Sequence, residues 1–210
     1  MEPQKNEKNG ACKLNLGCGR MILPGFINVD IMPLPGVDIT WDLNGLKKNP
    51  LPFADGSVSE ILCSHTLEHI DSVLDFMQDL HRVAQSGARA VFKVPYGSSD
   101  AAFEDPTHVR AFFLHSFEYF AQPCYWRADY GYRGDWKTEK IELLVDARKL
   151  KDDDVSCILD AINTRRNTVI EMTAVLSAVK PIRSPDKSFK SSPKLTVVLQ
   201  KDPPASDAEF

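Results

Sequence analysis

Two short stretches near the N-terminus carry residues suited to holding a ribose-containing ligand. Gly17 and Gly19 lie in LNLGCG, directly after a short apolar run, and Asp30 closes the next apolar run, INVD. A glycine at the end of a strand lets the backbone turn sharply and lets a ligand approach its amides. A carboxylate ending the following strand can accept hydrogen bonds from both ribose hydroxyls. These residues predict a nucleoside site, and a glycine-rich turn beside an exposed acid is the structural alternative.

The stretch between these residues departs from the pattern of dinucleotide-binding proteins. Ile22 stands where a third glycine would be, and Pro24 interrupts the helix. The third glycine normally permits close helix–strand packing beneath a pyrophosphate, so diphosphate binding loses support. Residues 17–25 are short for a parallel crossover, which predicts a tight loop or a single helical turn there. The pattern favours S-adenosylmethionine as cofactor, with a dinucleotide-dependent oxidoreductase as the alternative.

Residues 103–120, FEDPTHVRAFFLHSFEYF, concentrate titratable groups that could act on a substrate. Asp105 and His108 are candidate catalytic residues in this loop. An imidazole with an ordinary pKa near 6.5 is suited to accept a proton at neutral pH, which makes His108 the first candidate general base and His65 the second. The structural alternative is that the His108 imidazole only ties the loop to the core.

The motif HTLEH, residues 65–69, also matches the H-x-x-E-H pattern of inverted zinc peptidases. Two histidines four positions apart on a helix could ligate zinc, with a glutamate beside them as base. His65, however, directly follows a buried-strand pattern instead of lying within a helix. We therefore predict no metal site, and expect Glu68 and His69 to cap or hydrogen-bond at the start of a helix.

The elements that must position these residues are short strands with one clear helix between two of them. Alternating and continuous apolar runs predict strands at 12–16, 25–31, 37–43, 58–64 and 88–95, and a helix over 71–85 that stops at Gly87. This succession is typical of an α/β protein with a largely parallel sheet. In such sheets ligands collect at the carboxyl ends of the strands, where the candidate polar residues fall.

The second half of the sequence is less regular. Residues 138–145 and 194–201 are predicted to be strands that pair antiparallel, and 155–179 to be helical in part. The chain is predicted to form a single domain over residues 1–210, divided into a core at about 12–95, a substrate lid at about 96–137, C-terminal strands and a helix at 138–201, and a disordered tail at 202–210.

Composition narrows the partners. A chain of 210 residues, 43% of them hydrophobic, suffices for one sizeable core. A net charge of −4 gives no general attraction to nucleic acid or to an anionic membrane, and we predict neither as a partner. Five scattered cysteines and a polar N-terminus predict reduced thiols in a cytoplasmic protein. The oligomeric state stays open, with a homodimer as one alternative.

Four segments together carry a resemblance to a known family. LNLGCG, GFINVDI, DLNGLKKNPLPFADGSVSEILCSHTLEHI and FMQDLHRVAQSGARAVFKVP occur in the order seen in class I S-adenosylmethionine-dependent methyltransferases. The sequence resembles this family from about Lys13 to Pro95. It is most similar to a bacterial small-molecule or sugar-type subgroup with a truncated first helix and a DPTHVR segment. The resemblance implies a three-layer α/β/α Rossmann-like methyltransferase fold, with a mostly parallel seven-stranded sheet and an antiparallel strand near the C-terminus.

The resemblance also implies roles for individual residues in holding S-adenosylmethionine. By this resemblance, a wall against the methionine moiety is formed by Leu16, Gly17, Cys18 and Gly19. Asp30 would bind the ribose, and Asp42 the adenine, with Leu43 packing near the ring. The sulfonium end would lie beside Ser64 and His65. One departure is Asn15, which stands where the family usually has an acid. An amide can accept a hydrogen bond there but adds no negative charge.

The expected activity is O-methylation of a small molecule such as a sugar or saccharide precursor, by in-line methyl transfer with His108 as general base. Alternatives are N-methylation of a small amine, the oxidoreductase named above, and a non-catalytic regulator that keeps the cofactor site.

Overall fold

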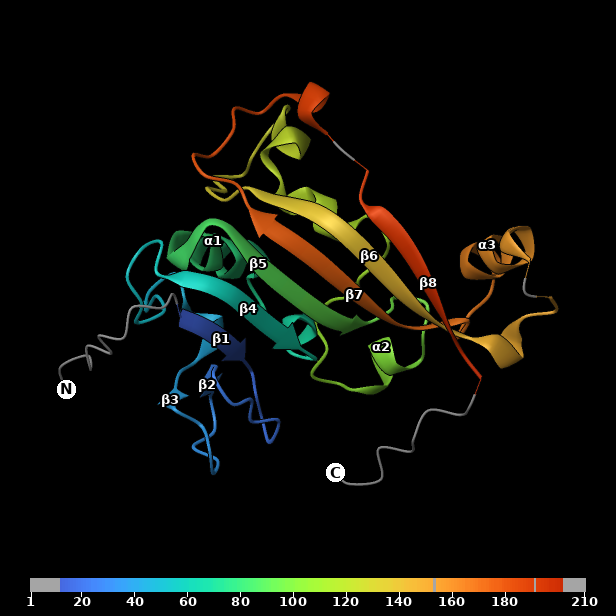
Figure 1. Ribbon diagram of the computed structural model, residues 1–210, viewed down its shortest axis with the longest axis horizontal. Coiled ribbons are helices and arrows are strands. Elements are labelled where there is room, and N and C mark those ends of the chain that lie inside the picture. The colour runs from blue at the N-terminus through green and yellow to red at the C-terminus, as the bar shows by residue number, and fades with distance from the viewer. Residues whose placement is uncertain (1–11, 153, 191, 202–210) are drawn as a thin grey trace.

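The computed structural model describes residues 12–152, 154–190 and 192–201. The tail predicted at 202–210 lies outside these residues. The described strands form one eight-stranded sheet, in the order β3-β2-β1-β4-β5-β7-β6-β8 (Figure 1). Their bounds are β1 Cys12–Leu16, β2 Ile27–Asp30, β3 Ile39–Thr40, β4 Val58–Ser64, β5 Ala84–Pro95, β6 Trp136–Asp146, β7 Val169–Ala178 and β8 Lys194–Gln200. The predicted α/β fold with a mostly parallel sheet is confirmed, but the sheet has eight strands instead of seven.

Strands β1 to β5 form the parallel half of the sheet, which creates the edge where the predicted site lies. β1 pairs with β2 and β4, and β4 pairs with β5, all in parallel. The apolar runs that predicted these strands are buried at Leu14, Leu16, Val29 and Ile61. Because the strands are parallel, the residues that follow β1, β2 and β4 meet at a common edge.

The connection between β1 and β2 has no helix among its described residues and consists of turns, as the sequence predicted. Two amides hold it instead. Asn15 is 2% exposed, and its Nδ2 donates to the carbonyl oxygen of Met21 at 2.7 Å and to Asn28 Oδ1 at 2.9 Å. Asn28 Oδ1 also accepts from the amide of Leu23 at 2.9 Å. Asn15 therefore stabilises the shortened loop, a task that needs a donor and that a carboxylate could not perform.

The pairing predicted for the C-terminal strands is wrong. β6 and β8 pair in parallel, and the antiparallel strand is β7, which lies between β5 and β6. β7 comes from the segment predicted to be partly helical, which holds both helix α3 (Val155–Thr164) and this strand. Every second residue of β7 from Met172 to Ala178 is buried, a period-2 pattern that the neighbouring helix obscured in the sequence.

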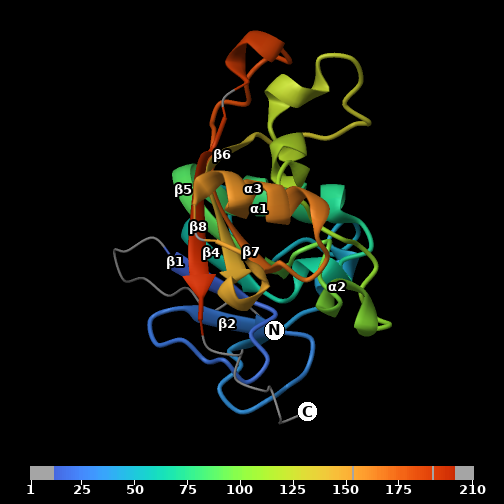
Figure 2. The same ribbon diagram turned by 90° about the vertical axis from the view of Figure 1, so that its right-hand side faces the viewer.

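Helices α1 (Val73–Val83), α2 (Ala101–Glu104) and α3 lie on the same side of the sheet (Figure 2). α1 buries Phe76, Met77 and Leu80, and the carbonyl oxygen of Met77 accepts a hydrogen bond from Trp136 Nε1 at 3.0 Å. α1 ends before Gly87, which lies within β5 at a φ of +74°, so the predicted stop at that glycine is wrong. None of the helices in the described ranges is both long enough and apolar enough to span a bilayer.

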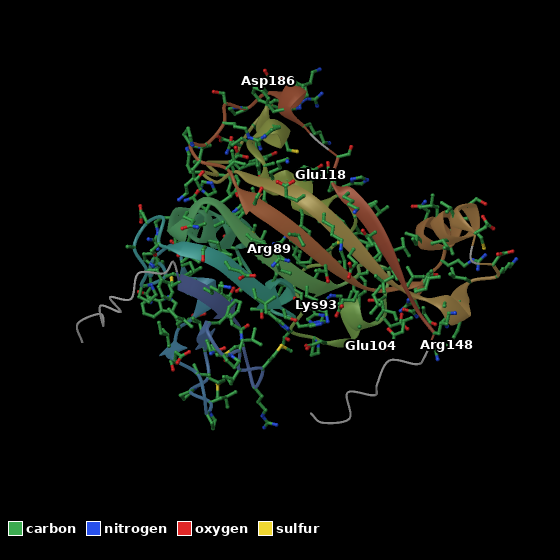
Figure 3. The ribbon with its side chains drawn as sticks, in the orientation of Figure 1. Arg89, Lys93, Glu104, Glu118, Arg148 and Asp186 are labelled. Atoms are coloured by element: carbon green, nitrogen blue, oxygen red, sulfur yellow. The ribbon has the colours of Figure 1, made fainter. Side chains whose placement is uncertain are left out.

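The face of the sheet turned away from the helices carries charged side chains. Arg89 and Lys93, labelled in Figure 3, alternate along β5 with the buried Ala90 and Phe92. Glu60 of β4 pairs with Arg89 at 3.1 Å on one side. This alternation is expected of strands with one solvated face.

An ion pair between the buried Asp135 and the partly exposed Arg183 ties the predicted lid to the C-terminal part of the chain. Asp135 is fully buried, and its carboxylate accepts hydrogen bonds from Arg183 Nε at 2.7 Å and Nη2 at 2.8 Å. The amide of Gln122 also donates to Asp135, at 3.1 Å. Bidentate contacts of this kind hold two segments in a fixed relation.

We expect Asp135→Ala to lower the free energy of unfolding by about 3–5 kcal/mol, because it leaves the Arg183 guanidinium without its buried partner. Urea unfolding followed by circular dichroism measures the change. The matched control is Glu139→Gln, which removes an exposed ion pair with Lys137 and should change stability by no more than about 1 kcal/mol. Equal losses for both variants would contradict a special contribution from Asp135.

Candidate cofactor and acceptor site

A cavity of about 250 Å³ opens at the carboxyl ends of β1, β2 and β4. Its lining includes five of the residues predicted to hold the cofactor: Gly17, Asp30, Asp42, Leu43 and His65. It also includes six residues that the sequence analysis did not assign to the cofactor: Ile31, Trp41, Asn44, Thr66, His69 and Ile70. Four of these six, Ile31, Trp41, Asn44 and Thr66, stand directly beside a predicted residue in the chain, which is the one signal that could have found them.

The turn after β1 is shaped by a close approach between Gly17 and Thr66. Gly17 has a φ of +63°, and a Cβ atom added there would lie 2.1 Å from Thr66 Oγ1. The Thr66 hydroxyl lies within hydrogen-bond distance of the carbonyl oxygens of Gly17 at 3.3 Å and Ser64 at 3.1 Å. Only glycine satisfies both the backbone conformation and the space, so the end of β1 lies directly against the end of β4.

Asp30 connects the glycine turn to the end of β2. Its Oδ2 accepts a hydrogen bond from the amide of Gly19 at 2.7 Å, and its Oδ1 accepts one from the amide of Met32 at 2.9 Å. A carboxylate has about four acceptor positions, so two remain for a ligand. This arrangement fits a pair of ribose hydroxyls, because the carboxylate is already held in place before a ligand arrives.

The residues suited to the adenine follow β3. Asp42 accepts a hydrogen bond from the amide of Asn44 at 2.8 Å through Oδ1, which caps a short 3₁₀ turn at Leu43–Gly45. Asn44 in turn accepts from the amide of Asp71 at 2.8 Å and donates to the carbonyl oxygen of His69 at 3.2 Å. The loop after β3 is thereby fixed to the loop after β4, with Leu43 and Trp41 supplying apolar surface to the cavity.

Four predicted cofactor residues do not line this cavity. Leu16 is fully buried in the core, and Cys18 is buried with its thiol 3.7 Å from the carbonyl oxygen of Gly19. Ser64 directly precedes the lining residue His65, and the amide of Gly19 donates to the lining residue Asp30. The side chains of Leu16 and Cys18 thus pack in the protein interior beneath the turn and do not face the cavity.

His65 is held between two carboxylates. Its Nε2 lies 2.9 Å from Glu171 Oε2, and its Nδ1 lies 3.5 Å from Glu68 Oε1. The hydrogen bond to Glu171, followed by the interaction with Glu68, raises the pKa of His65 to about 9. The imidazole is therefore a cation at neutral pH, which disfavours it as a general base.

The loop carrying DPTHVR lies against the segment carrying HTLEH. The amide of Val109 donates to the carbonyl oxygen of Glu68 at 2.9 Å, and the rings of His69 and His108 meet edge to face with their centres 4.7 Å apart. His108 does not line the candidate cofactor cavity, but its neighbour His69 does. Asp105 accepts a hydrogen bond from the Thr107 hydroxyl at 2.6 Å, and its Oδ2 lies 3.8 Å from His108 Nε2.

A larger cavity of about 630 Å³ lies over the predicted lid, and aromatic residues dominate its lining. Tyr96, Phe113, Tyr119 and Tyr130 contribute to it, together with Arg110. The Arg110 guanidinium donates to the carbonyl oxygen of Asp71, next to the Ile70 that lines the cofactor cavity. The size and lining of this larger, aromatic cavity suit a small organic acceptor.

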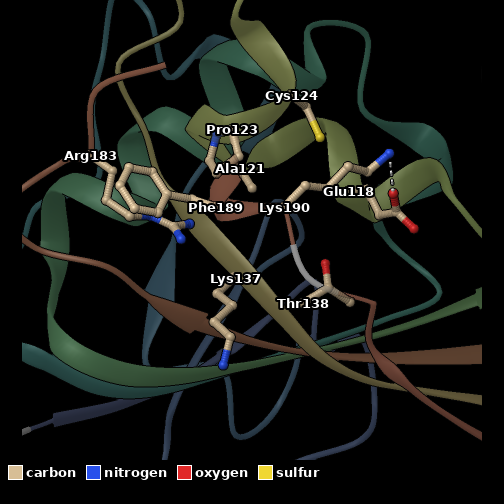
Figure 4. Close-up of a pocket in the computed structure, with 9 residues that line it drawn as sticks. All are labelled: Glu118, Ala121, Pro123, Cys124, Lys137, Thr138, Arg183, Phe189 and Lys190. Atoms are coloured by element: carbon tan, nitrogen blue, oxygen red, sulfur yellow. Dashed lines mark ion pairs between the residues drawn. The ribbon is translucent and has the colours of Figure 1, made fainter. Parts of the chain in front are cut away.

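A third hollow, drawn in Figure 4, is too small for such a ligand. Lys190 and Glu118, paired at 3.0 Å, border it together with Arg183, and its volume is about 20 Å³. That is room for about one water molecule. Its residues therefore belong to the packing of the lid.

Comparison with known proteins is consistent with this geometry. A sequence family described as a methyltransferase domain matches residues 37–92. No curated protein matches the chain.

Among solved structures, a SAM-dependent methyltransferase from Archaeoglobus fulgidus is similar, with 19% identity, 79% of this chain and 86% of that chain covered, and a TM-score of 0.55. A possible histamine N-methyltransferase from Thermotoga maritima has 12% identity, coverage of 83% and 84%, and a TM-score of 0.49. The matched segment spans Asp42, Leu43, Ser64 and His65, and the first of these structures shares the fold. The chain therefore matches a methyltransferase domain family over residues 37–92 and shares the fold of a solved S-adenosylmethionine-dependent methyltransferase.

Proposed function

We propose that the chain is a class I S-adenosylmethionine-dependent methyltransferase that transfers a methyl group to a hydroxyl of a small molecule, such as a sugar or saccharide precursor, with His108 as the general base. The observation that carries the proposal is the contact between His69, which lines the cofactor cavity, and His108 of the DPTHVR loop, at 4.7 Å between ring centres. This contact brings a basic nitrogen close to the cavity where the cofactor binds. The subgroup that the sequence resembles supports the sugar-type acceptor.

The cofactor is held by the residues at the strand ends. Asp30 binds the ribose hydroxyls, Asp42 the adenine amino group, and the backbone at Gly17 allows the methionine end to approach closely. When bound, S-adenosylmethionine supplies a methyl group activated by its sulfonium. The protein's own contribution is alignment of the acceptor, which can account for about 7–11 kcal/mol of the barrier in favourable systems.

A hydroxyl acceptor must also lose its proton. His108 Nδ1 lies 3.4 Å from the carbonyl oxygen of Ala102, a contact in which Nδ1 donates its proton and Nε2 keeps a lone pair. Nε2 is then the nitrogen that accepts the proton. An amine with a depressed pKa would need less help from a base, so N-methylation is the second candidate.

The acceptor is expected to occupy the aromatic cavity over the lid. Tyrosine rings combine a flat apolar face with a polar edge, which suits stacking on a sugar or an aromatic ring. Arg110 adds a fixed positive charge at the end of this cavity closest to Asp71. A hydroxylated ring with an anionic substituent would use both features.

A cytoplasmic setting fits the state of the cysteines. All five lie among the described residues and are free thiols. Free thiols persist where the surroundings are reducing.

We expect S-adenosylhomocysteine to raise the melting temperature, whereas NAD and NADP should leave it unchanged. Asp30→Asn should weaken S-adenosylhomocysteine binding about 10–100-fold, the equivalent of a charged hydrogen bond of about 1.5–3 kcal/mol. Isothermal titration calorimetry measures the change. Asp55→Asn, a change at an exposed ion pair with Arg82, is the control and should bind normally. Stabilisation by NAD instead would sink the cofactor assignment.

His108→Gln should lower the rate of methyl transfer about 10²–10⁴-fold, the usual contribution of a general base, while S-adenosylhomocysteine still binds. Transfer of label from S-adenosylmethionine to a panel of glycosides and other small alcohols measures the rate. Glu104→Gln, a change at an exposed residue that ends the preceding helix α2, should leave the rate unchanged. If the His108→Gln variant still transfers methyl groups at the normal rate, His108 is not the base. If the unmodified chain binds S-adenosylhomocysteine but methylates none of the acceptors, a non-catalytic regulator is favoured.

A further inference from the structure

A buried carboxylate faces two imidazoles where HTLEH meets DPTHVR. Glu68 is 1% exposed, and neither of its carboxylate oxygens makes a hydrogen bond within the described part of the chain. One oxygen of Glu68 and one ring nitrogen each of His69 and His108 lie within 4.8 Å of one another. We propose that these three residues bind a divalent transition metal ion, with Zn²⁺ as the best-suited one.

The unpartnered carboxylate is the first reason. Burying a charged group without hydrogen bonds is strongly unfavourable. The nearest positive group, His65, lies 3.5 Å away at Nδ1 and gives its shorter contact, 2.9 Å, to Glu171. A cation bound by Glu68 would supply the close partner that the carboxylate lacks.

The second reason is that hydrogen bonds already orient both imidazoles. His69 Nδ1 lies 2.9 Å from Thr107 Oγ1 and 3.3 Å from the carbonyl oxygen of Thr107. The Thr107 hydroxyl donates its own proton to Asp105 at 2.6 Å, so His69 Nδ1 must be the donor in both contacts. His108 Nδ1 likewise faces the carbonyl oxygen of Ala102 at 3.4 Å.

Each ring is therefore left with a free lone pair on Nε2, the usual state of a metal-binding histidine whose other nitrogen donates to a carbonyl or carboxylate. Donors about 2.0–2.2 Å from zinc are roughly 3–4 Å apart, so small side-chain rotations would close the present spacing.

The donor set selects the class of metal. Two imidazole nitrogens and one carboxylate oxygen suit Zn²⁺ and its neighbours, whereas Mg²⁺ and Ca²⁺ prefer oxygens alone. Three protein ligands leave one position of a tetrahedral ion open. His69 also lines the cofactor cavity, so the ion can enter from that side.

The sequence predicts no metal here, because His65 does not lie in a helix with His69. That reasoning holds for His65, which Glu171 engages, but the second imidazole comes from His108, 39 positions beyond His69.

The metal site has one consequence for catalysis, and that consequence rests on the proposed function. A histidine whose Nε2 lone pair binds a metal cannot accept a proton from an acceptor hydroxyl. Zn²⁺ at saturation should therefore suppress the methyl transfer that depends on His108. The ion and the substrate proton would compete for one nitrogen.

The experiment measures binding of Zn²⁺ alone to the full chain after treatment with a chelator. Isothermal titration calorimetry should give one equivalent bound, with a rise in melting temperature. Glu68→Gln, His69→Gln and His108→Gln should each weaken binding at least tenfold. His115→Gln, which removes an exposed imidazole paired with Glu118, should keep the full affinity.

Substitution with Co²⁺ separates this site from the five thiols. Its absorption spectrum should show nitrogen and oxygen ligands without a sulfur charge-transfer band. A sulfur band, or binding unchanged in Glu68→Gln and His69→Gln, would overturn the metal site. Glu68→Gln is expected to fold, because it keeps the size of the buried side chain and loses only the long 3.5 Å ion pair with His65.

The outcomes for the site and for the proposed function are distinct. Failure of Zn²⁺ to bind, with turnover still lost in His108→Gln, would overturn the metal site and leave the general base. Zn²⁺ binding with turnover unaffected by His108→Gln would support the metal site and overturn the general base.

Discussion

The contact between Gly17 and Thr66 determines where everything else in the site can lie. A side chain at position 17 would occupy the space of the Thr66 hydroxyl, so the ends of β1 and β4 can touch only through glycine. That contact closes one wall of the cavity proposed to bind the cofactor. It also sets the position at which the chain leaves β4, and therefore where HTLEH begins. Asp30 then fixes the turn from the other side through the amide of Gly19.

Much of the parallel half of the fold follows from short-range patterns. The strands at 12–16 and 58–64 have the bounds that their apolar runs predict, and the absence of a helix between β1 and β2 follows from Pro24 and the short connection. The C-terminal half could not be obtained in this way. β7 pairs with β5 across about 80 positions of sequence, and such pairing is decided by packing that no local period contains. β8 likewise joins an edge that exists only once β6 is in place.

The site shows the same division. Residues at the end of a strand or just beyond it, such as Gly17, Asp30 and Asp42, can be found by counting along the chain. Those that depend on a loop folding back are not. The meeting of His69 with His108 requires residues 96–110 to return over the end of β4, and the backbone bond from Val109 to Glu68 that holds them together leaves no trace in the sequence. Asn15 is the opposite case. The sequence marks it as an amide where the family usually has an acid, but only its hydrogen bonds to Met21 and Asn28 explain the amide.

The charged face of the sheet has a consequence for how the strands find their alignment. Lys13, Glu60 and Arg89 stand in one row across β1, β4 and β5, paired at 2.9 and 3.1 Å. Side chains alternate strictly along a strand, so a slip of β4 by one residue would turn Glu60 toward the helices and Ile61 toward water. A register shift by an odd number of residues would therefore be unfavourable for two reasons: the ion pairs would be lost, and the carboxylate of Glu60 would be buried. The charged row therefore favours the native register of the sheet over the shifted ones.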